Sequence, residues 1–403
     1  MPFDYPTAFS CWGEEEREAI DRVVASGQFT MAGEVEAFEH EFAAWHGRKY
    51  GVMVNSGSSA NLVAVAALFE KHDAPLQRAE VAARYQWDDN GHGVSHGPQI
   101  GAIGDVAVVP AVAWSTTYAP LVQHGLTLAL ADVDATWNAP VPATPLPSLT
   151  RLVVLCSILG NPAYGTEWLA KAKAAGAYVI EDNCESFGAS VGGCLCGTFG
   201  TLSTFSFFHS HQISAIEGGM ILTDDDELAR LCRILRAHGW TRDVEPANRF
   251  DDEYLFSYFG YNLRPLEMHA AIARAQLPKQ QGFAQARRNN ATMFRLMAGN
   301  VVKFPSWRGE PNPFGLAFLC PSAEDRAPLA AALRAEGIDC RLPTGGSFRL
   351  HPYGKAWAHQ ETPRADDVHR RGMFLGNAPY DISDKIEKAV RIIRATLKRE
   401  IAA

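Results

Sequence analysis

Long apolar segments and an excess of positive charge are both missing from this chain of 403 residues. No window of about 18 apolar residues occurs, so no segment is predicted to span a membrane. Residues 1–6, Met-Pro-Phe-Asp-Tyr-Pro, lack the basic and then apolar pattern of a secretory leader, and we expect a cytoplasmic protein. The chain has 37 Lys and Arg against 45 Asp and Glu, a formal net charge of -8. This balance argues against a general nucleic-acid or anionic-membrane binder, which needs a basic face.

Closely paired cysteines are scarce as well. The 8 cysteines are scattered along the chain, which suits reduced thiols better than a disulfide framework. Only Cys194 and Cys196 are close together, and no second pair completes a zinc pattern, so two small residues in a Gly-rich turn are the simpler interpretation. His92 and His96 lie in a polar loop expected over residues 79–105, without a cluster of further ligands. We interpret them as surface residues and predict no metal site.

Short apolar runs recur along the first half of the chain. They predict strands at residues 50–55, 106–109, 126–131, 152–155 and 178–180, with segments of helix length between most of them. Such alternation predicts an α/β domain with a mainly parallel sheet covered on both faces. Two amphipathic helices are expected ahead of this domain, over residues 14–26 and 35–45.

The pattern changes near residues 262–265, where a long helical segment follows over 266–296 with a kink or break at Pro278. A strand, a helix and a short apolar run then predict a smaller α+β domain, at residues 316–320, 326–336 and 340–342. We therefore predict a large domain over residues 1–265, which includes the N-terminal helices. Residues 266–403 are predicted to form a long linking helix and a small C-terminal domain.

Three stretches place functional groups where expected strands end. Residues 56–61, Ser-Gly-Ser-Ser-Ala-Asn, lie between a strand and a helix, where backbone N–H groups and the helix dipole bind anions. Asp182 follows an apolar strand, the position at which α/β sheets hold ligands. For both stretches a simple helix cap is the alternative. His209 and His211 follow a strand expected over residues 202–208, but no third metal ligand is evident beside them.

Six motifs in a fixed order resemble those of one enzyme family. They are Ser-Gly-Ser-Ser-Ala-Asn from Ser56, Pro-Ala-Val-Ala-Trp-Ser-Thr-Thr from Pro110, Glu-Asp-Asn-Cys-Glu-Ser from Glu181, Phe-Ser-Phe-Phe from Phe205, Glu-Gly-Gly from Glu217 and Gly-Tyr-Asn-Leu-Arg-Pro from Gly260. On these residues the chain resembles the DegT/DnrJ/EryC/StrS sugar aminotransferase-like family over residues 29–377. The resemblance implies the aspartate-aminotransferase architecture (fold type I), with pyridoxal 5'-phosphate or pyridoxamine 5'-phosphate bound in the large domain. It also implies a homodimer with shared active sites.

One position departs from the family pattern. Most members carry a lysine where His211 stands, and this sequence has no lysine between Lys173 and Lys279. Histidine forms no stable Schiff base, so an ordinary aminotransferase cycle is disfavoured. Within the family, the chain resembles a subgroup of 3-dehydratases that carry histidine in place of the lysine. The resemblance is carried by His211, by Phe-Thr-Met at residues 29–31 and by the stretches 237–242 and 338–341. A related dehydratase needs a Cys-x-Cys-x7-Cys motif that is not found here, so no iron–sulfur cluster is expected.

The subgroup implies a reaction and its partners. The expected substrate is an NDP-4-keto-6-deoxyhexose, with GDP-4-keto-6-deoxymannose as the first choice, and L-glutamate is the expected amino donor. Loss of the C3 hydroxyl would yield a 4-keto-3,6-dideoxy sugar, with release of ammonia. Such sugars serve O-antigen and lipopolysaccharide biosynthesis. Two alternatives stay open: a sugar aminotransferase that uses free pyridoxamine phosphate, and a non-catalytic cofactor-binding protein.

The resemblance also assigns cofactor contacts. Asp182 would pair with the protonated pyridine nitrogen, which keeps the ring an electron sink. Trp114 would stack on that ring. The phosphate would be held by Gly57, Ser58 and Ser206.

The remaining assignments concern proton transfer and substrate. His211 is expected to act as general acid and base, because an unperturbed histidine pKa of about 6.5 permits proton exchange near neutral pH. Asn262 is expected to reach the phosphate in the neighbouring subunit. Glu185 is assigned to the cofactor site, whereas substrate contacts are expected from His238, Arg242 and Arg341. For His238 a core or capping role is the alternative, and for the two arginines a solvated surface position.

Overall fold

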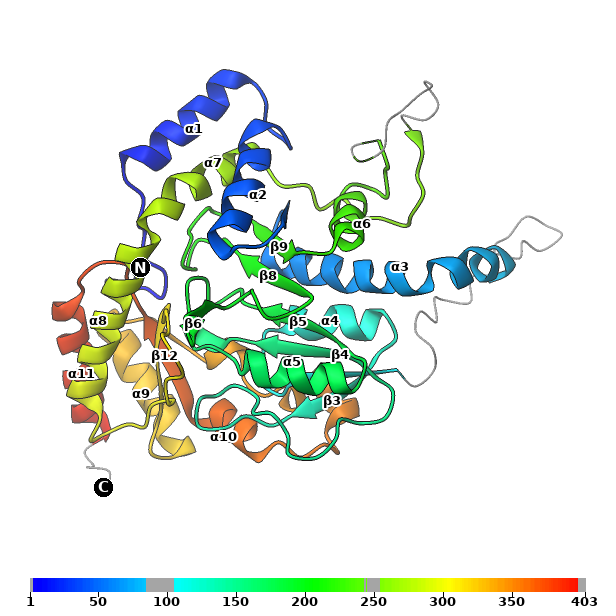
Figure 1. Ribbon diagram of the computed structural model, residues 1–403. Coiled ribbons are helices and arrows are strands. Elements are labelled where there is room, and N and C mark those ends of the chain that lie inside the picture. Colours follow the sequence, from blue (N-terminus) through cyan, green and yellow to red (C-terminus); the bar gives the residue numbers. More distant parts are fainter. Residues whose placement is uncertain (1–2, 85–104, 243, 245–253, 398–403) are drawn as a thin grey trace, which may run out of the picture.

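The computed structural model describes residues 3–84, 105–242, 244 and 254–397. These residues form a seven-stranded sheet at the centre, with the strand order β1-β9-β8-β5-β4-β2-β3 (Figure 1). Its strands are β1 (Tyr50–Val54), β2 (Val106–Pro110), β3 (Thr127–Ala131), β4 (Thr150–Cys156), β5 (Tyr178–Asp182), β8 (Leu202–Ser206) and β9 (Gly219–Thr223). Neighbours from β8 to β3 are parallel, whereas β9 is antiparallel to both β1 and β8. The predicted mainly parallel sheet is confirmed.

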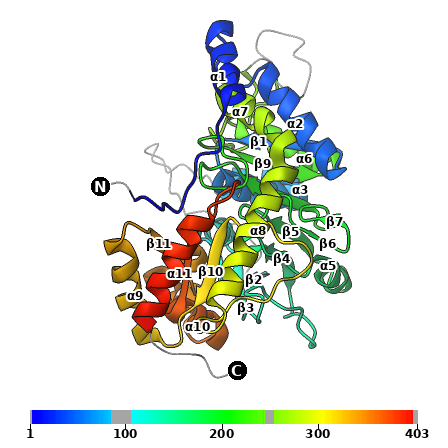
Figure 2. The same cartoon turned by 90° about the vertical axis from the view of Figure 1, so that its left-hand side faces the viewer.

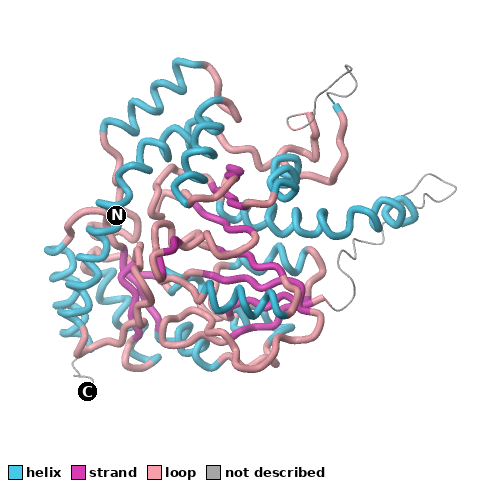
Figure 3. The backbone as a smooth tube through the Cα atoms, viewed as in Figure 1, coloured by secondary structure: helices cyan, strands magenta, loops and turns pink. Residues whose placement is uncertain are grey.

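The apolar strands are buried on both faces of this sheet. In β4, Leu152 and Val154 pack into one hydrophobic core, whereas Val153 and Leu155 pack into another on the opposite face. Successive side chains of a strand point to opposite faces, so a strand covered on both sides must be apolar throughout. The covering helices are α2 (Gly33–His46), α3 (Gly57–Arg84), α4 (Ser115–Gln123), α5 (Gly165–Ala174) and α6 (Asp226–Arg236). Figure 3 shows the strands grouped inside this helical cover.

A broken helix links the large sheet to a second core. It consists of α7 (Glu267–Gln276), a 3₁₀ turn η3 (Leu277–Lys279) and α8 (Gln280–Ala298), and α1 (Glu14–Ser26) packs against α7. The predicted break at Pro278 is confirmed. Proline has no backbone N–H for the helical ladder and its ring clashes with the preceding turn.

The second core surrounds a three-stranded antiparallel sheet, visible in Figure 2 beside α8. The sheet has the order β10-β12-β11, formed by β10 (Gly315–Leu319), β11 (Cys340–Arg341) and β12 (Gly372–Gly376). Its helices are α9 (Ala323–Ala335), α10 (Pro363–Arg371) and α11 (Ser383–Leu397), with the 3₁₀ turns η4 (Pro343–Gly345), η5 (Phe348–Leu350) and η6 (Pro352–Trp357). Tyr5 joins this core and donates its hydroxyl to the carbonyl of Gly376 at 2.9 Å. The N-terminal residues thus pack on the small sheet, while the domain division at residues 265 and 266 stays a prediction.

Some local expectations need correction. Residues 79–84 continue α3, so the prediction of a loop over those residues is wrong, and His92 and His96 lie outside the described residues. The strand predicted over residues 202–208 ends at Ser206. Cys194 is the first residue of strand β7 (Cys194–Leu195), which pairs with β6 (Ser190–Val191), and only Cys196 lies in a turn, directly after β7; all eight cysteines are free thiols. No helix among the described residues is both long and apolar enough to cross a membrane.

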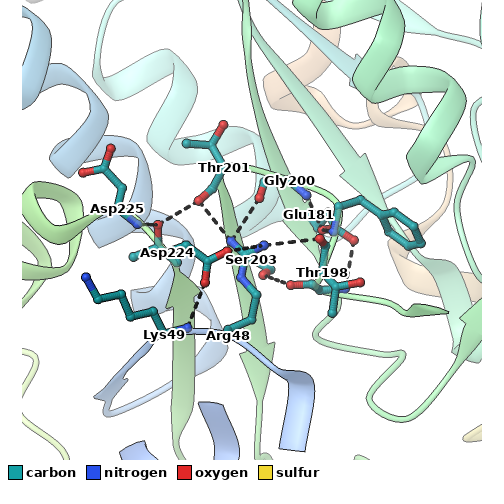
Figure 4. A network of polar contacts seen from close by, with 12 residues as sticks. Arg48, Lys49, Glu181, Thr198, Gly200, Thr201, Ser203, Asp224 and Asp225 are labelled. Atoms are coloured by element: carbon teal, nitrogen blue, oxygen red, sulfur yellow. Dashed lines mark hydrogen bonds and ion pairs between the residues drawn. The ribbon is translucent and has the colours of Figure 1, made fainter. Parts of the chain in front are cut away.

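Glu181, the next-to-last residue of β5, anchors the loop that leads into β8 (Figure 4). Its buried carboxylate accepts the backbone N–H groups of Gly197, Phe199 and Gly200 at 2.8, 2.7 and 2.6 Å. Arg48 secures the same loop from the other side by donating to the carbonyls of Thr198 and Gly200 at 3.2 and 3.1 Å. These bonds hold the ends of β5 and β8 in register, and both strands lead into the site described below.

Replacement of Glu181 by glutamine should therefore destabilise the fold. The amide offers one acceptor oxygen and sets an NH₂ group against a backbone donor, so we expect a loss of about 2–4 kcal/mol in the free energy of unfolding. The exposed Glu36→Gln change is the matched control, with an expected effect within about 0.5 kcal/mol. Urea denaturation measures both variants, and equal stability of the two would show that Glu181 does not anchor the loop.

Candidate active site

A cavity of about 390 Å³ opens where the carboxyl ends of β4, β5 and β8 meet the N-terminus of α3. Ligands bind at this edge of open α/β sheets because the loops and helix N-termini converge there. The small domain closes one side with Arg341, Thr344 and Phe374. Of the residues predicted for the site, eight line this cavity: Gly57, Ser58, Trp114, Asp182, Glu185, Ser206, His211 and Arg341.

The predicted anion turn connects β1 to α3. The helix begins at Gly57, and a Cβ atom added there would lie 2.5 Å from Cβ of Ser206 and 2.8 Å from Sγ of Cys184. Only glycine fits so close to the strand ends. The Ser56 hydroxyl accepts the N–H of Ser59 at 3.1 Å, so this serine also caps the helix. The helix-cap interpretation is therefore confirmed, and binding of a phosphate by the same turn stays a prediction.

Asp182 is held rigidly at the end of β5. Its Oδ2 accepts from Nδ2 of Asn61 at 2.8 Å and from the hydroxyl of Thr117 at 2.7 Å. Asn61 is itself oriented by Thr204, whose hydroxyl donates to Oδ1 at 2.6 Å. The carboxylate is 3% exposed and lies in the cavity wall, which is where a partner for a protonated ring nitrogen is required.

His211 lies in the loop between β8 and β9 with its ring against Phe314, at a centroid distance of 5.3 Å. Burial lowers its pKa to about 4 against the opposing effect of the Ser206 backbone, and the nearby His209 and Arg287 lower it further. Among the described residues Nδ1 has no hydrogen-bond partner and is buried. The expected histidine pKa near 6.5 is therefore wrong for this environment, and His211 is a neutral base at neutral pH. His209 lies on the exposed side of the same loop.

Glu185 follows β5, and like His211 it has a pKa shifted in the direction that favours the uncharged form. Burial raises its pKa to about 7, against the opposing effect of hydrogen bonds from Leu159 and Thr344. Its backbone carbonyl accepts from Nε2 of Gln212 at 2.6 Å, and Gln212 is the residue next to His211. The backbone of Glu185 is thus tied to the histidine loop.

Three predicted residues do not line this cavity within one chain. His238, Arg242 and Asn262 belong to an arm formed by residues 237–242 and 254–262, in which Ala237 pairs with Asn262 and Trp240 with Phe256. Arg242 lies over the Trp240 ring at 3.8 Å. Figure 1 shows this arm beside α6, on the side away from the small domain. Their assigned roles stay predictions.

Several residues of the site were missed because their role depends on contacts between distant segments. Asn61, Thr117 and Thr204 hold Asp182, and Asn61 already lay within the quoted serine motif. Gln212 and Thr344 bind Glu185, and Thr344 is 159 residues away from it in sequence. No local spacing indicates such a pair.

The residues present fit a pyridoxal phosphate group. An oriented carboxylate for the ring, a glycine turn beside Ser206 for the phosphate and an imidazole nitrogen without a partner all occur at one cavity. None of the described residues that line the cavity is a lysine. Nor do three or more His, Cys, Asp or Glu side chains gather as metal ligands in the described parts of the chain.

This combination of a mainly parallel sheet and a strand-end aspartate defines a pyridoxal-phosphate protein of the aminotransferase fold. The chain belongs to the DegT/DnrJ/EryC1/StrS aminotransferase family, whose model matches residues 10–80 and 96–394. The family, fold and cofactor predicted from the sequence are confirmed.

Relatives within this family are similar over nearly the whole chain. GDP-4-keto-6-deoxy-D-mannose 3-dehydratase of Yersinia pseudotuberculosis is 34% identical, over 97% of this chain and 98% of the relative. A solved GDP-4-keto-6-deoxymannose-3-dehydratase with a trapped PLP-glutamate geminal diamine has a TM-score of 0.84 at 33% identity, covering 97% of this chain and 100% of that one. A histidine-to-asparagine mutant of such a dehydratase with bound GDP-perosamine has the same TM-score of 0.84, 33% identity and coverage of 97% and 100%.

The lowered pKa of His211 can be measured in the cofactor-free protein. Its folded pKa of about 4 lies below the ordinary value of 6.5, so the neutral ring contributes stability that is present above pH 6.5 and lost as the pH falls through about 4. We expect imidazole ¹⁵N chemical shifts to report a neutral ring at pH 6, with His211→Asn used to assign the signal. A midpoint near 6.5 would show that burial does not control this residue.

Proposed function

We propose that this chain is a pyridoxal-phosphate-dependent 3-dehydratase that removes the C3 hydroxyl of an NDP-4-keto-6-deoxyhexose. The observation that carries the proposal is His211, a base in the cavity of an aminotransferase-family fold whose described lining has no lysine. A lysine amine would recapture the cofactor as a Schiff base, which an imidazole cannot do. The site is therefore suited to elimination and not to an ordinary amino-transfer cycle.

The relatives point to the substrate. Their names specify GDP-4-keto-6-deoxymannose and removal at C3, and their bound molecules are a GDP-sugar and a glutamate adduct of the cofactor. We propose GDP-4-keto-6-deoxymannose as substrate and L-glutamate as amino donor. The products are then a 4-keto-3,6-dideoxy sugar for polysaccharide biosynthesis and ammonia.

Different residues of the cavity are proposed to bind the ring and the phosphate of the cofactor. Pyridoxamine phosphate, when bound, supplies an amine for the C4 ketone and a ring that withdraws electrons. Asp182 would hold the ring nitrogen in its protonated form, because hydrogen bonds from Asn61 and Thr117 keep the carboxylate oriented. Gly57 and Ser206 would bind the phosphate, and Trp114 would cover the ring, since all three line the cavity.

His211 carries the proton. Its ring is neutral at neutral pH because burial lowers its pKa, so a nitrogen lone pair would accept the proton that the bound cofactor loses at C4′. The imidazolium formed in this way donates the proton to the departing C3 hydroxyl. Burial makes the charged ring unfavourable, which favours rapid return of the proton.

We also propose that the active enzyme is a homodimer in which the arm of one chain completes the cavity of the other. His238, Arg242 and Asn262 lie on this arm, outside the cavity of their own chain. The arm exposes apolar side chains that a partner surface can cover, since Leu255 and Phe256 are 49% and 56% exposed. A symmetric dimer buries the same surface on both chains.

The direct test combines the enzyme, pyridoxal phosphate, L-glutamate and GDP-4-keto-6-deoxymannose. We expect ammonia and a nucleotide-linked dideoxy sugar by mass spectrometry. An aminated sugar would identify an aminotransferase that uses free pyridoxamine phosphate. A cofactor spectrum that does not respond to glutamate would identify a non-catalytic binder.

His211→Asn and His209→Asn form a matched pair of controls for this assay. The first should lower turnover by at least about 10²-fold, the scale of general acid–base catalysis, while cofactor absorbance shows retained binding. The second changes an exposed histidine of the same loop and should leave turnover unchanged. Full activity of His211→Asn would remove this residue from the reaction.

Mixing two inactive variants tests the shared site. A dimer of a His211→Asn chain and an Asn262→Ala chain contains one intact site if Asn262 acts in the partner. An equal mixture that exchanges subunits should then recover about a quarter of wild-type turnover, because half the dimers are mixed and each has one working site. No recovery, despite exchange shown by native mass spectrometry, would place Asn262 in its own chain's site.

A further inference from the structure

The Glu185 carboxylate joins three segments that are distant in sequence. Its Oε2 accepts the backbone N–H of Leu159 at 2.8 Å and the hydroxyl of Thr344 at 2.9 Å. Leu159 belongs to the 3₁₀ turn η1 (Ile158–Gly160), which follows β4, whereas Thr344 belongs to η4 of the small domain. This carboxylate is therefore a direct link between the large sheet and the small domain at the cavity wall.

Both donors have unusual backbone conformations. Leu159 has φ 51° and Thr344 has φ 44°, in the left-handed region that residues other than glycine rarely adopt, and threonine least of all because its Cβ is branched. Such strain persists where surrounding contacts fix it, and it concentrates at functional sites. At position 344 glycine would adopt this backbone with less strain, but it would lack the hydroxyl that reaches Glu185. The cost of threonine here is explained by that hydroxyl.

The geometry leaves the other carboxylate oxygen for the cavity. Within the described part of the chain both hydrogen bonds to the side chain go to Oε2, and Glu185 lines the cavity. Gln212 holds the backbone of the same residue through its carbonyl at 2.6 Å. Main chain and side chain are thus both fixed, with Oε1 free to meet a ligand.

We propose that Thr344 is a positioning residue, which holds the Glu185 carboxyl group toward the cavity. Only the consequence for turnover rests on the proposed function. The link between the two side chains is independent of any ligand.

The electrostatic surroundings agree with this role. Burial raises the pKa of Glu185 to about 7, the bonds from Leu159 and Thr344 lower it, and the charge of Asp182 raises it. The other titratable or charged side chains that line the cavity are Cys156, Cys184, His211, Glu217 and Arg341. Removing the threonine hydroxyl removes one donor to the carboxylate, so the ionised form becomes less stable.

Two variants remove the hydroxyl in different ways. Thr344→Val keeps the branched shape, whereas Thr344→Gly relieves the backbone strain and so protects the test against a failure to fold. Thr344→Ser is the matched control because it retains the donor. Unfolding of the cofactor-free protein by urea is measured between about pH 5 and 9 for all three and for the wild type.

The expected result follows from proton linkage. The folded pKa of about 7 lies above the ordinary value of 4.5, so the contribution of Glu185 to stability is present below pH 4.5 and lost as the pH rises through about 7. In Thr344→Val and Thr344→Gly the folded-state pKa of Glu185 should be higher by about one pH unit, which is a tenfold change in the proton affinity of the folded state. The free energy of unfolding should therefore keep falling up to a correspondingly higher pH. Thr344→Ser should follow the wild type, and adding Glu185→Gln should abolish the shift.

Turnover supplies the second readout. In the pH profile of kcat/KM, the apparent pKa that belongs to Glu185 is the one that disappears in Glu185→Gln. This pKa should be higher by about one pH unit in Thr344→Val and should have the wild-type value in Thr344→Ser. The proposal would be overturned if Thr344→Val and Thr344→Gly lowered the free energy of unfolding equally at every pH, and if this loss were the same in the Glu185→Gln background. Absence of wild-type turnover would count against the proposed function alone, since the unfolding measurements still decide the role of Thr344.

Discussion

The hydrogen-bonded anchoring of the end of β5 is the constraint on which the rest of the site depends. Glu181 and Asp182 are consecutive, so their side chains point to opposite faces of the sheet. Glu181 accepts three backbone N–H groups of the loop before β8, whereas Asp182 accepts from Asn61 and Thr117 at the cavity. One carboxylate therefore fixes the position of the strand end, and the other lies in the cavity wall at that position.

Burial moves the pKa values of His211 and Glu185, which both line this cavity, in opposite directions. It lowers the pKa of His211 to about 4 and raises that of Glu185 to about 7. A low-polarity environment disfavours charge of either sign, so a base is kept neutral and an acid is kept partly protonated at the same pH. Groups whose pKa values are moved apart in this way are suited to separate acid and base roles. The loop that carries His211 is also tied to Glu185 through Gln212.

The cavity depends equally on the contact between the two cores. Large-domain strands supply its floor, while Arg341, Thr344 and Phe374 of the small domain supply one wall. The bond from Thr344 to Glu185 crosses between these parts. Any change in how the small domain sits would therefore alter the hydrogen bonding of a group inside the cavity.

Local pattern predicted the mainly parallel sheet, the break at Pro278, and functional groups at the glycine turn and Asp182, while the resemblance to the family was needed to see that His211 stands at a lysine position. Each of the local features depends on neighbouring residues: strand periodicity, the missing N–H of proline, and functional groups at strand ends. Only the tertiary structure decided the pKa of His211, the contacts of Glu185 with Leu159 and Thr344, and the position of the arm with Asn262 outside its own cavity. Burial and contacts between residues as far apart as 159 positions arise only when the chain is packed, because no spacing in the sequence records which segments will meet.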